Sequence, residues 1–151
     1  MTTMIETRDT REGTFTVLTD VTLNWVKVVK PVASYNGGKP QYELQIATND
    51  TTQAEAWNSV MPNLRINPEG TSVFTLKRAA FLGAPAVVYE DGAAMEVATR
   101  RIIGNGSTGD VRISHRVHKT GRPYVTLEAI KIKTLVEYVQ DNPEYTDNFD
   151  F

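Results

Sequence analysis

Hydrophobic and polar residues alternate along much of this chain with the two-residue period of β-strands. Residues 41–48 alternate most regularly, with Leu44 and Ile46 on the apolar face and glutamine or glutamate on the other. A run rich in β-branched residues precedes them at 22–30, and a cluster of turn-forming residues at 35–40 separates the two runs. The pattern therefore predicts a β-hairpin.

The same period predicts strands at 72–82 and 85–90, and two longer strands on either side of a turn at 119–123. In the last strand the apolar series shifts by one residue near Ala129. A single β-bulge at that point would keep both halves of the series facing inward. Long strands with a bulge are a common way to bend a sheet around a small barrel.

One helix is predicted, over residues 51–61, with Asn49 or Asp50 as its N-cap. With five or six predicted strands and one short helix, the chain is expected to belong to the all-β class. We expect an OB-like Greek-key barrel over residues 14–139, with a β-sandwich as the structural alternative. Residues 1–13 are polar and are expected to form a flexible arm or an irregular first strand.

The glycine-rich segment at 104–109 is interpreted as a flexible connector. A phosphate-binding loop would need a lysine after its last glycine and a helix behind it, and this chain has neither feature there.

Charge is divided unevenly along the chain, which has a net charge of −2. Residues 134–151 hold five of the 18 acidic residues and none of the 16 basic ones, so the remainder carries about +3. Residues 100–133 alone contain eight basic residues and two acidic ones. A cationic body with an acidic tail suggests a protein that binds polyanions and carries its own competitor.

The tail, residues 140–151, also contains aromatic residues, which solubilising tails usually lack. We therefore favour a docking role for it over a purely solubilising one. The tail residues predicted to dock a partner are Asp147, Phe149, Asp150 and Phe151.

Several classes of function are excluded or disfavoured. The chain has no cysteine, so disulfides and thiolate metal sites are excluded. His115 and His118 would face opposite sides of a strand, which argues against a zinc site. No nucleophile motif is recognisable, so we predict neither an enzyme nor a cofactor. With no secretory signal and no apolar run long enough to span a bilayer, a soluble intracellular protein is expected.

The strongest positive signal is a set of basic residues interleaved with rings. Arg112 and Arg116 are four residues apart on a predicted strand, about 13 Å, a spacing that suits successive phosphates. Cations along a backbone and rings for stacking are what single-strand binding requires; a solvated strand face is the alternative. Of the adjacent Lys77 and Arg78, at most one is expected to line the cleft. The residues predicted to contact nucleic acid are Lys30, Tyr35, Lys39, Lys77, Arg78, Arg112, Arg116, His118, Lys119, Arg122 and Tyr124.

Three further aromatic residues are interpreted differently. Tyr42 lies on the apolar face of its strand and is expected in the core rather than at the ligand. Trp57 is expected to pack its helix against the barrel. Trp25 fits either role.

Taken in order, several stretches resemble the single-stranded-DNA-binding proteins of short-tailed bacteriophages. These are a first hairpin at 25–46 followed by an Asn-Asp-led helix, a strand and turn at 87–92, a glycine loop at 102–107, the last two strands at 111–139, and an acidic tail that ends on Asp-Phe. This chain departs from the family in a much shorter tail and a leaner region between strands.

The resemblance implies an OB fold and sequence-tolerant binding of single-stranded DNA during phage DNA replication and recombination. It also implies a tail that contacts replication proteins such as a polymerase or helicase, in the cytoplasm of an infected bacterium. It raises a homodimer as an alternative to a monomer. The competing hypothesis from another class is a small virion structural or assembly protein with a β-sandwich fold.

Overall fold

The computed structural model describes residues 5–10, 13–33, 39–61, 66–67 and 69–137. Within these ranges, two 3-10 segments and one α-helix interrupt the strands. The elements are β1 (Ile5–Thr10), β2 (Gly13–Val32), β3 (Gln41–Thr48), α1 (Thr51–Asn58), β4 (Ser72–Ala79), η1 (Ala80–Leu82), β5 (Ala86–Tyr89), η2 (Val97–Ile102), β6 (Ser107–Val117) and β7 (Pro123–Thr134).

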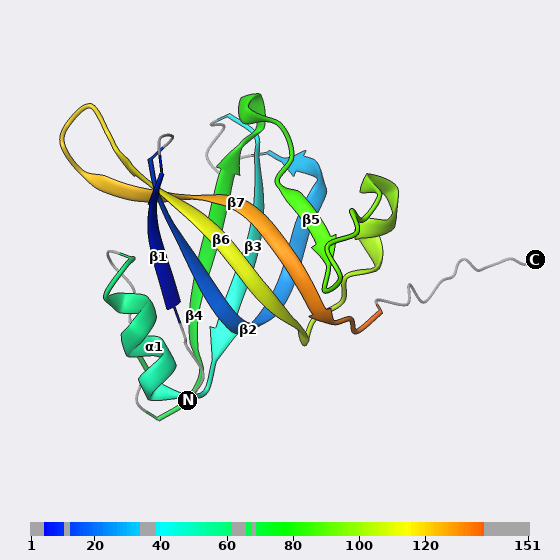
Figure 1. The fold of residues 1–151 in the computed structure, drawn as a ribbon, viewed down its shortest axis with the longest axis horizontal. Helices are drawn as coiled ribbons and strands as arrows, with labels where there is room; N and C mark the ends of the chain where they lie inside the picture. The colour runs from blue at the N-terminus through cyan, green and yellow to red at the C-terminus, as the bar shows by residue number, and fades with distance from the viewer. Residues whose placement is uncertain (1–4, 11–12, 34–38, 62–65, 68, 138–151) are drawn as a thin grey trace, which may run out of the picture.

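One sheet contains all seven described strands, in the order β4-β3-β2-β6-β7-β5, with β1 paired to β2 (Figure 1). Its pairs are antiparallel except for β5 with β7. The sheet curls until β4 meets β7, where the Arg78 guanidinium donates to the Leu127 carbonyl oxygen at 3.2 Å. The expected all-β, OB-like class is confirmed, and the β-sandwich alternative is wrong because a single continuous sheet encloses the core.

Strand β2 runs for 20 residues because two left-handed residues let it bend. Asp20 and Trp25 have φ values of 52° and 50°, and the pairing register shifts at both places. Side chains from the β6 side hold each bend. The Asp20 N–H donates to the Asp110 carboxylate at 3.1 Å, and the Trp25 N–H donates to the Asn105 side-chain oxygen at 2.8 Å. The first half of β2 therefore pairs with β6 and the second half with β3.

The bulge expected near Ala129 is present. Register between β6 and β7 shifts between Leu127 and Ala129, so Glu128 is the additional residue. A second shift leaves Lys133 unpaired in the ladder. The Lys133 ammonium lies 3.0 Å from the Asp20 carboxylate and 3.1 Å from that of Asp110, and these two hydrogen bonds raise its pKa.

The structure decides between the two alternatives for the N-terminal segment and corrects two boundaries. Ile5–Thr10 is a first strand rather than a flexible arm, because it pairs residue by residue with the start of β2 and packs Ile5 on the core. The glycine connector is shorter than expected, because Ser107–Gly109 already belongs to β6. In addition, β4 ends at Ala79 rather than at residue 82.

Helix α1 forms as the sequence predicts, with Asp50 as the N-cap accepting from the Thr52 N–H at 2.9 Å. It ends at Asn58, three residues earlier than expected. Trp57 is fully buried, so it does anchor the helix to the barrel. Tyr42 is half-buried, whereas Trp25 is 62% exposed.

At the second register shift, the backbones of β6 and β7 approach closely at Gly109, and a substitution there can test this contact. A Cβ at this position would lie 1.9 Å from the Lys131 carbonyl oxygen, so Gly109→Ala forces the backbones apart. We expect the free energy of unfolding to fall by about 3 kcal/mol, the upper part of the range for overpacked sites. The control is Gly121→Ala, where φ is 87° and the space is empty, with an expected loss of about 1 kcal/mol. Equal losses in chemical denaturation would contradict the close approach.

Candidate nucleic-acid interface

Two adjoining hollows follow the seam between β4 and β7. They have volumes of about 500 and 380 Å³, and both are lined by Lys77, Tyr124 and Val125. We call the pair the β4–β7 groove. One side is formed by the end of β4 and η1, and the other by the β6–β7 hairpin, which projects beyond the barrel (Figure 1).

Four cationic side chains line this groove: Lys77, Arg78, Arg116 and Arg122. None of the described residues that line it is acidic. No ion pair within the described ranges engages Lys77 or Arg122. The groove therefore presents positive charge to solvent and suits a polyanionic ligand.

Exposed rings stand beside these cations. Tyr124 is 41% exposed, and Phe81 on η1 is 81% exposed. His118 meets Tyr124 edge-on, with ring centroids 6.5 Å apart, which helps to fix the tyrosine ring. Phe81 is not among the predicted contact residues, because the sequence pattern predicted a strand that continues through residue 82. The segment Gly83-Ala84-Pro85 contains two residues that interrupt strands, and it could have indicated that the strand ends before Phe81.

Glu128 lies behind the groove and connects three strands. Its carboxylate accepts from the Ser114 hydroxyl at 2.7 Å and lies 3.3 Å from Arg78 and 3.6 Å from Arg116. Arg78 also donates to the carbonyl oxygens of Gly83 and Leu82 at 2.8 and 3.0 Å. Because Arg78 is held by these partners, its first role is to fix the wall of the groove.

The structure brings together five of the eleven predicted contact residues: Lys77, Arg78, Arg116, Arg122 and Tyr124. The expectation that only one of Lys77 and Arg78 could line the cleft is wrong. The groove crosses the edge of β4, so side chains from both faces of that strand reach it.

The other predicted residues lie elsewhere. Arg112 is stacked on the Phe15 ring, 4.0 Å from its centroid, and does not line the groove. His118 and Lys119 are exposed at the hairpin tip, Lys39 is exposed before β3, and Lys30 lines a separate hollow on β2. Tyr35 and the tail residues Asp147, Phe149, Asp150 and Phe151 fall outside the described residues. For all of these, contact with a ligand stays a prediction.

Two partly or fully buried ionisable groups have structural roles. His115 contacts the Thr16 hydroxyl at 2.6 Å, and its burial lowers the pKa of the imidazole. Arg100 donates to the carbonyl oxygens of Pro85 and Val28, and desolvation lowers its pKa. Within the described ranges, no group of His, Asp or Glu side chains is arranged to hold a metal ion. No helix there is long and apolar enough to cross a membrane.

Comparison with known proteins finds the fold in bacteriophage proteins. No protein-family model matches the sequence, and no curated protein matches it significantly. The solved single-stranded DNA-binding protein from bacteriophage Enc34, in complex with ssDNA, superimposes with a TM-score of 0.60 at 15% identity, covering 95% of this chain and 96% of that one. A C-terminally truncated form of the same protein superimposes with a TM-score of 0.59 at 14% identity, covering 89% of this chain and 92% of that one.

The gp2.5 protein of bacteriophage T7, also a single-stranded DNA-binding protein, gives a TM-score of 0.53 at 19% identity, covering 94% of this chain and all of that one. The resemblance expected from the sequence is thereby confirmed at the level of the fold.

Two neighbouring residues on β4 have different roles in the groove. Arg78 supports its wall, whereas Lys77 contributes charge at its surface. Arg78→Ala removes hydrogen bonds from a charged donor to three carbonyl groups, so the free energy of unfolding should fall by about 3 kcal/mol. Arg78→Lys should recover only part of this, because an ammonium lacks the planar fork of donors. Lys77→Ala, at an exposed position, should change stability by less than about 0.5 kcal/mol. Equal stability of the two alanine variants in urea titrations would refute the role of Arg78.

Proposed function

We propose that this protein binds single-stranded DNA without strong sequence preference and has no enzymatic activity. The observation that carries the proposal is the β4–β7 groove, whose described lining combines four cationic side chains and two exposed rings with no acidic residue. The proteins that share its fold support it, since they are named as single-stranded DNA-binding proteins and one was solved with ssDNA.

The chemistry of the groove favours single strands over duplex. Lys77 and Arg122 neutralise phosphates and release counterions, which gives affinity without reading sequence. Tyr124 and Phe81 offer faces on which unpaired bases stack, and every base has such a face. In a duplex these faces are hidden within the base stack, so the rings contribute little.

The position of the groove in the barrel agrees with this use. Counted around the barrel, β2, β3, β4, β6 and β7 correspond to the five strands of an OB fold. OB folds bind oligonucleotides on the face of their second and third strands and with the loop between the fourth and fifth. Here these are β3, β4 and the hairpin loop 118–122, the elements that border the β4–β7 groove.

The acidic tail supplies a competitor for the same site. The 14 residues after Glu137 can span at most about 45–50 Å, and tethering gives them a high effective concentration at the cationic groove. Phe149 and Phe151 would occupy the stacking positions until DNA displaces them. The released tail would then dock a replication protein such as a polymerase or helicase during phage DNA replication and recombination in the infected bacterial cytoplasm.

A role in virion assembly, the alternative drawn from the sequence, has less support. That hypothesis relied on a β-sandwich with a docking tail, whereas the chain forms a barrel with a cationic groove.

Titration of labelled oligo-dT by fluorescence anisotropy at several salt concentrations tests the proposed site. Affinity should fall steeply with salt, and Lys77→Ala or Arg122→Ala should each lower the slope of log affinity against log salt by about 0.7, the contribution of one phosphate contact on a single strand. Tyr124→Ala or Phe81→Ala should cost about 1–3 kcal/mol with the slope nearly unchanged, because stacking carries no counterion release.

Matched controls lie away from the groove. Lys131→Ala removes an exposed strand lysine and Tyr89→Ala removes a partly exposed ring on β5, and neither residue lines the groove. Both controls should bind like the parent protein. Affinity that is indifferent to salt, or equal affinity for duplex of the same length, would contradict the proposal.

The tail makes a separate prediction. Deletion of residues 141–151 should tighten binding of oligo-dT, most clearly at low salt, where competition between charges is least screened. The same deletion should abolish binding of the replication partner, and Phe151→Ala alone should weaken it. If the full-length and truncated proteins bind oligo-dT with equal affinity at both low and high salt, the tail does not enter the groove.

A further inference from the structure

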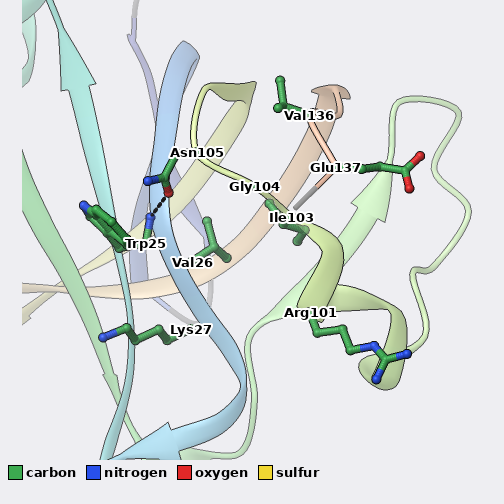
Figure 2. A pocket seen from close by; sticks show the side chains of 9 residues that line it. All are labelled: Trp25, Val26, Lys27, Arg101, Ile103, Gly104, Asn105, Val136 and Glu137. Atoms are coloured by element: carbon green, nitrogen blue, oxygen red, sulfur yellow. Dashed lines mark hydrogen bonds between the residues drawn. The ribbon is translucent and has the colours of Figure 1, made fainter. Parts of the chain in front are cut away.

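Another hollow lies along the second half of β2, on the far side of β3 from β4 (Figure 2). It has a volume of about 470 Å³ and is continuous with another hollow that shares Val26, Lys27 and Arg101. We call the two together the β2 groove. In Figure 2 the Trp25 ring and the Lys27 side chain extend to the same side of β2, and Asn105 reaches back to the Trp25 backbone.

Trp25 is held in an unusual state. It is 62% exposed, although Trp57, the other tryptophan of the chain, is fully buried. Its φ of 50° is rare for a bulky side chain and costs about 1–2 kcal/mol. The hydrogen bond from its N–H to Asn105 maintains this conformation. A strained backbone that presents a large ring to solvent is a feature found at binding sites.

The charges around Trp25 are mainly positive. Lys27, Lys30 and Arg101 line the β2 groove, and no ion pair among the described residues engages any of them. Glu137 is the one acidic residue among the described lining residues. Of the three cations, Lys27 extends to the same side of β2 as the exposed indole, whereas the Arg101 side chain extends to the other side (Figure 2). Cations that flank an exposed ring have the composition of a single-strand contact site.

The two grooves open on one face of the sheet. Lys27 on β2 pairs in register with Glu43 on β3, and Glu43 pairs with Lys77 on β4. Side chains of directly paired residues point to the same face, so Lys27 and Lys77 lie on one surface about 10 Å apart, two strand spacings. Glu43 lies between them on the same surface, so a strand that leaves the β4–β7 groove passes beside this carboxylate as it crosses β3 toward Trp25.

We propose that the β2 groove is a second contact site for the same DNA strand, which extends the proposed function. Trp25 stacks on a base there, and Lys27 and Arg101 neutralise the neighbouring phosphates. Short oligonucleotides fill the β4–β7 groove alone, whereas longer ones bind both grooves. The acidic tail is the competing occupant, because it follows directly from Glu137.

Tryptophan fluorescence tests this in the full-length protein, because Trp57 is buried and Trp25 is exposed. Oligo-dT of increasing length, from about 4 to 16 nucleotides, the range for one OB fold, is titrated while emission and affinity are followed. The shortest oligonucleotides should bind without quenching, and quenching should begin once the strand is long enough to reach Trp25.

Trp25→Asn removes the ring and keeps a residue that tolerates positive φ. It should abolish the quenching and weaken the longest oligonucleotide about 5- to 150-fold, the equivalent of one lost stack, while leaving the shortest unaffected. Lys27→Ala should also weaken only the longer strands. Lys131→Ala, outside both grooves, should leave every length unchanged.

The outcomes separate the two proposals. If long oligonucleotides bind but neither quench Trp25 nor respond to Trp25→Asn, the β2 groove is not a contact site and the proposed function stands. If no oligonucleotide binds at any length, the proposed function fails as well. If DNA leaves Trp25 emission unchanged but a peptide of residues 138–151 quenches it in the truncated protein, the groove belongs to the tail and the inference is overturned.

Discussion

The carboxylate of Glu128 lies at the seam between β4 and β7 and links the strands that meet there. Within the described chain, β4 and β7 form no ladder with each other, and their closure depends on the Arg78 side chain. Glu128 receives Arg78 from β4 together with Arg116 and Ser114 from β6. Three strands therefore converge on one bulged residue. Removal of one partner from such an ion pair should lower the free energy of unfolding substantially, because the remaining charge is left without a partner.

This closure determines what the surface above it can do. Glu128 contacts the two arginines but does not itself line the β4–β7 groove, and none of the described residues that line the groove is acidic. Lys77 and Arg122 are then free to meet an anionic backbone, while Arg78 and Arg116 hold the wall. The same sheet face continues across β3 to Lys27 and Trp25. Positive charge and exposed rings thus border both sides of one continuous surface.

Local patterns predicted a large part of this fold. The alternation in 41–48, the Asp50 cap and the phase change near Ala129 each depend on neighbouring residues, and each is present in the structure. Arg122 and Tyr124 were likewise predicted as basic or aromatic residues at a turn, and Lys77 as a basic residue of a strand, and the three meet in one groove.

The remaining features depend on contacts that are distant in sequence. The pairing of β1, the left-handed bend at Trp25 and the capture of Arg78 by Glu128 all involve partners that periodicity does not identify. Arg112 has the residue type and spacing expected of a phosphate contact. Its guanidinium is instead stacked on the ring of Phe15, which is distant in sequence. Phe81 was missed because a strand was extended over a 3-10 turn.

The most direct test of the central claim is to identify the residues that touch DNA. An oligo-dT in which single thymines are replaced by 5-iodouracil is bound to the full-length protein, photocrosslinked and digested, and the adducts are located by mass spectrometry. The account predicts adducts at Tyr124 and Phe81, the rings that border the β4–β7 groove. Adducts confined to residues outside that groove, such as Tyr89 on β5, would contradict it.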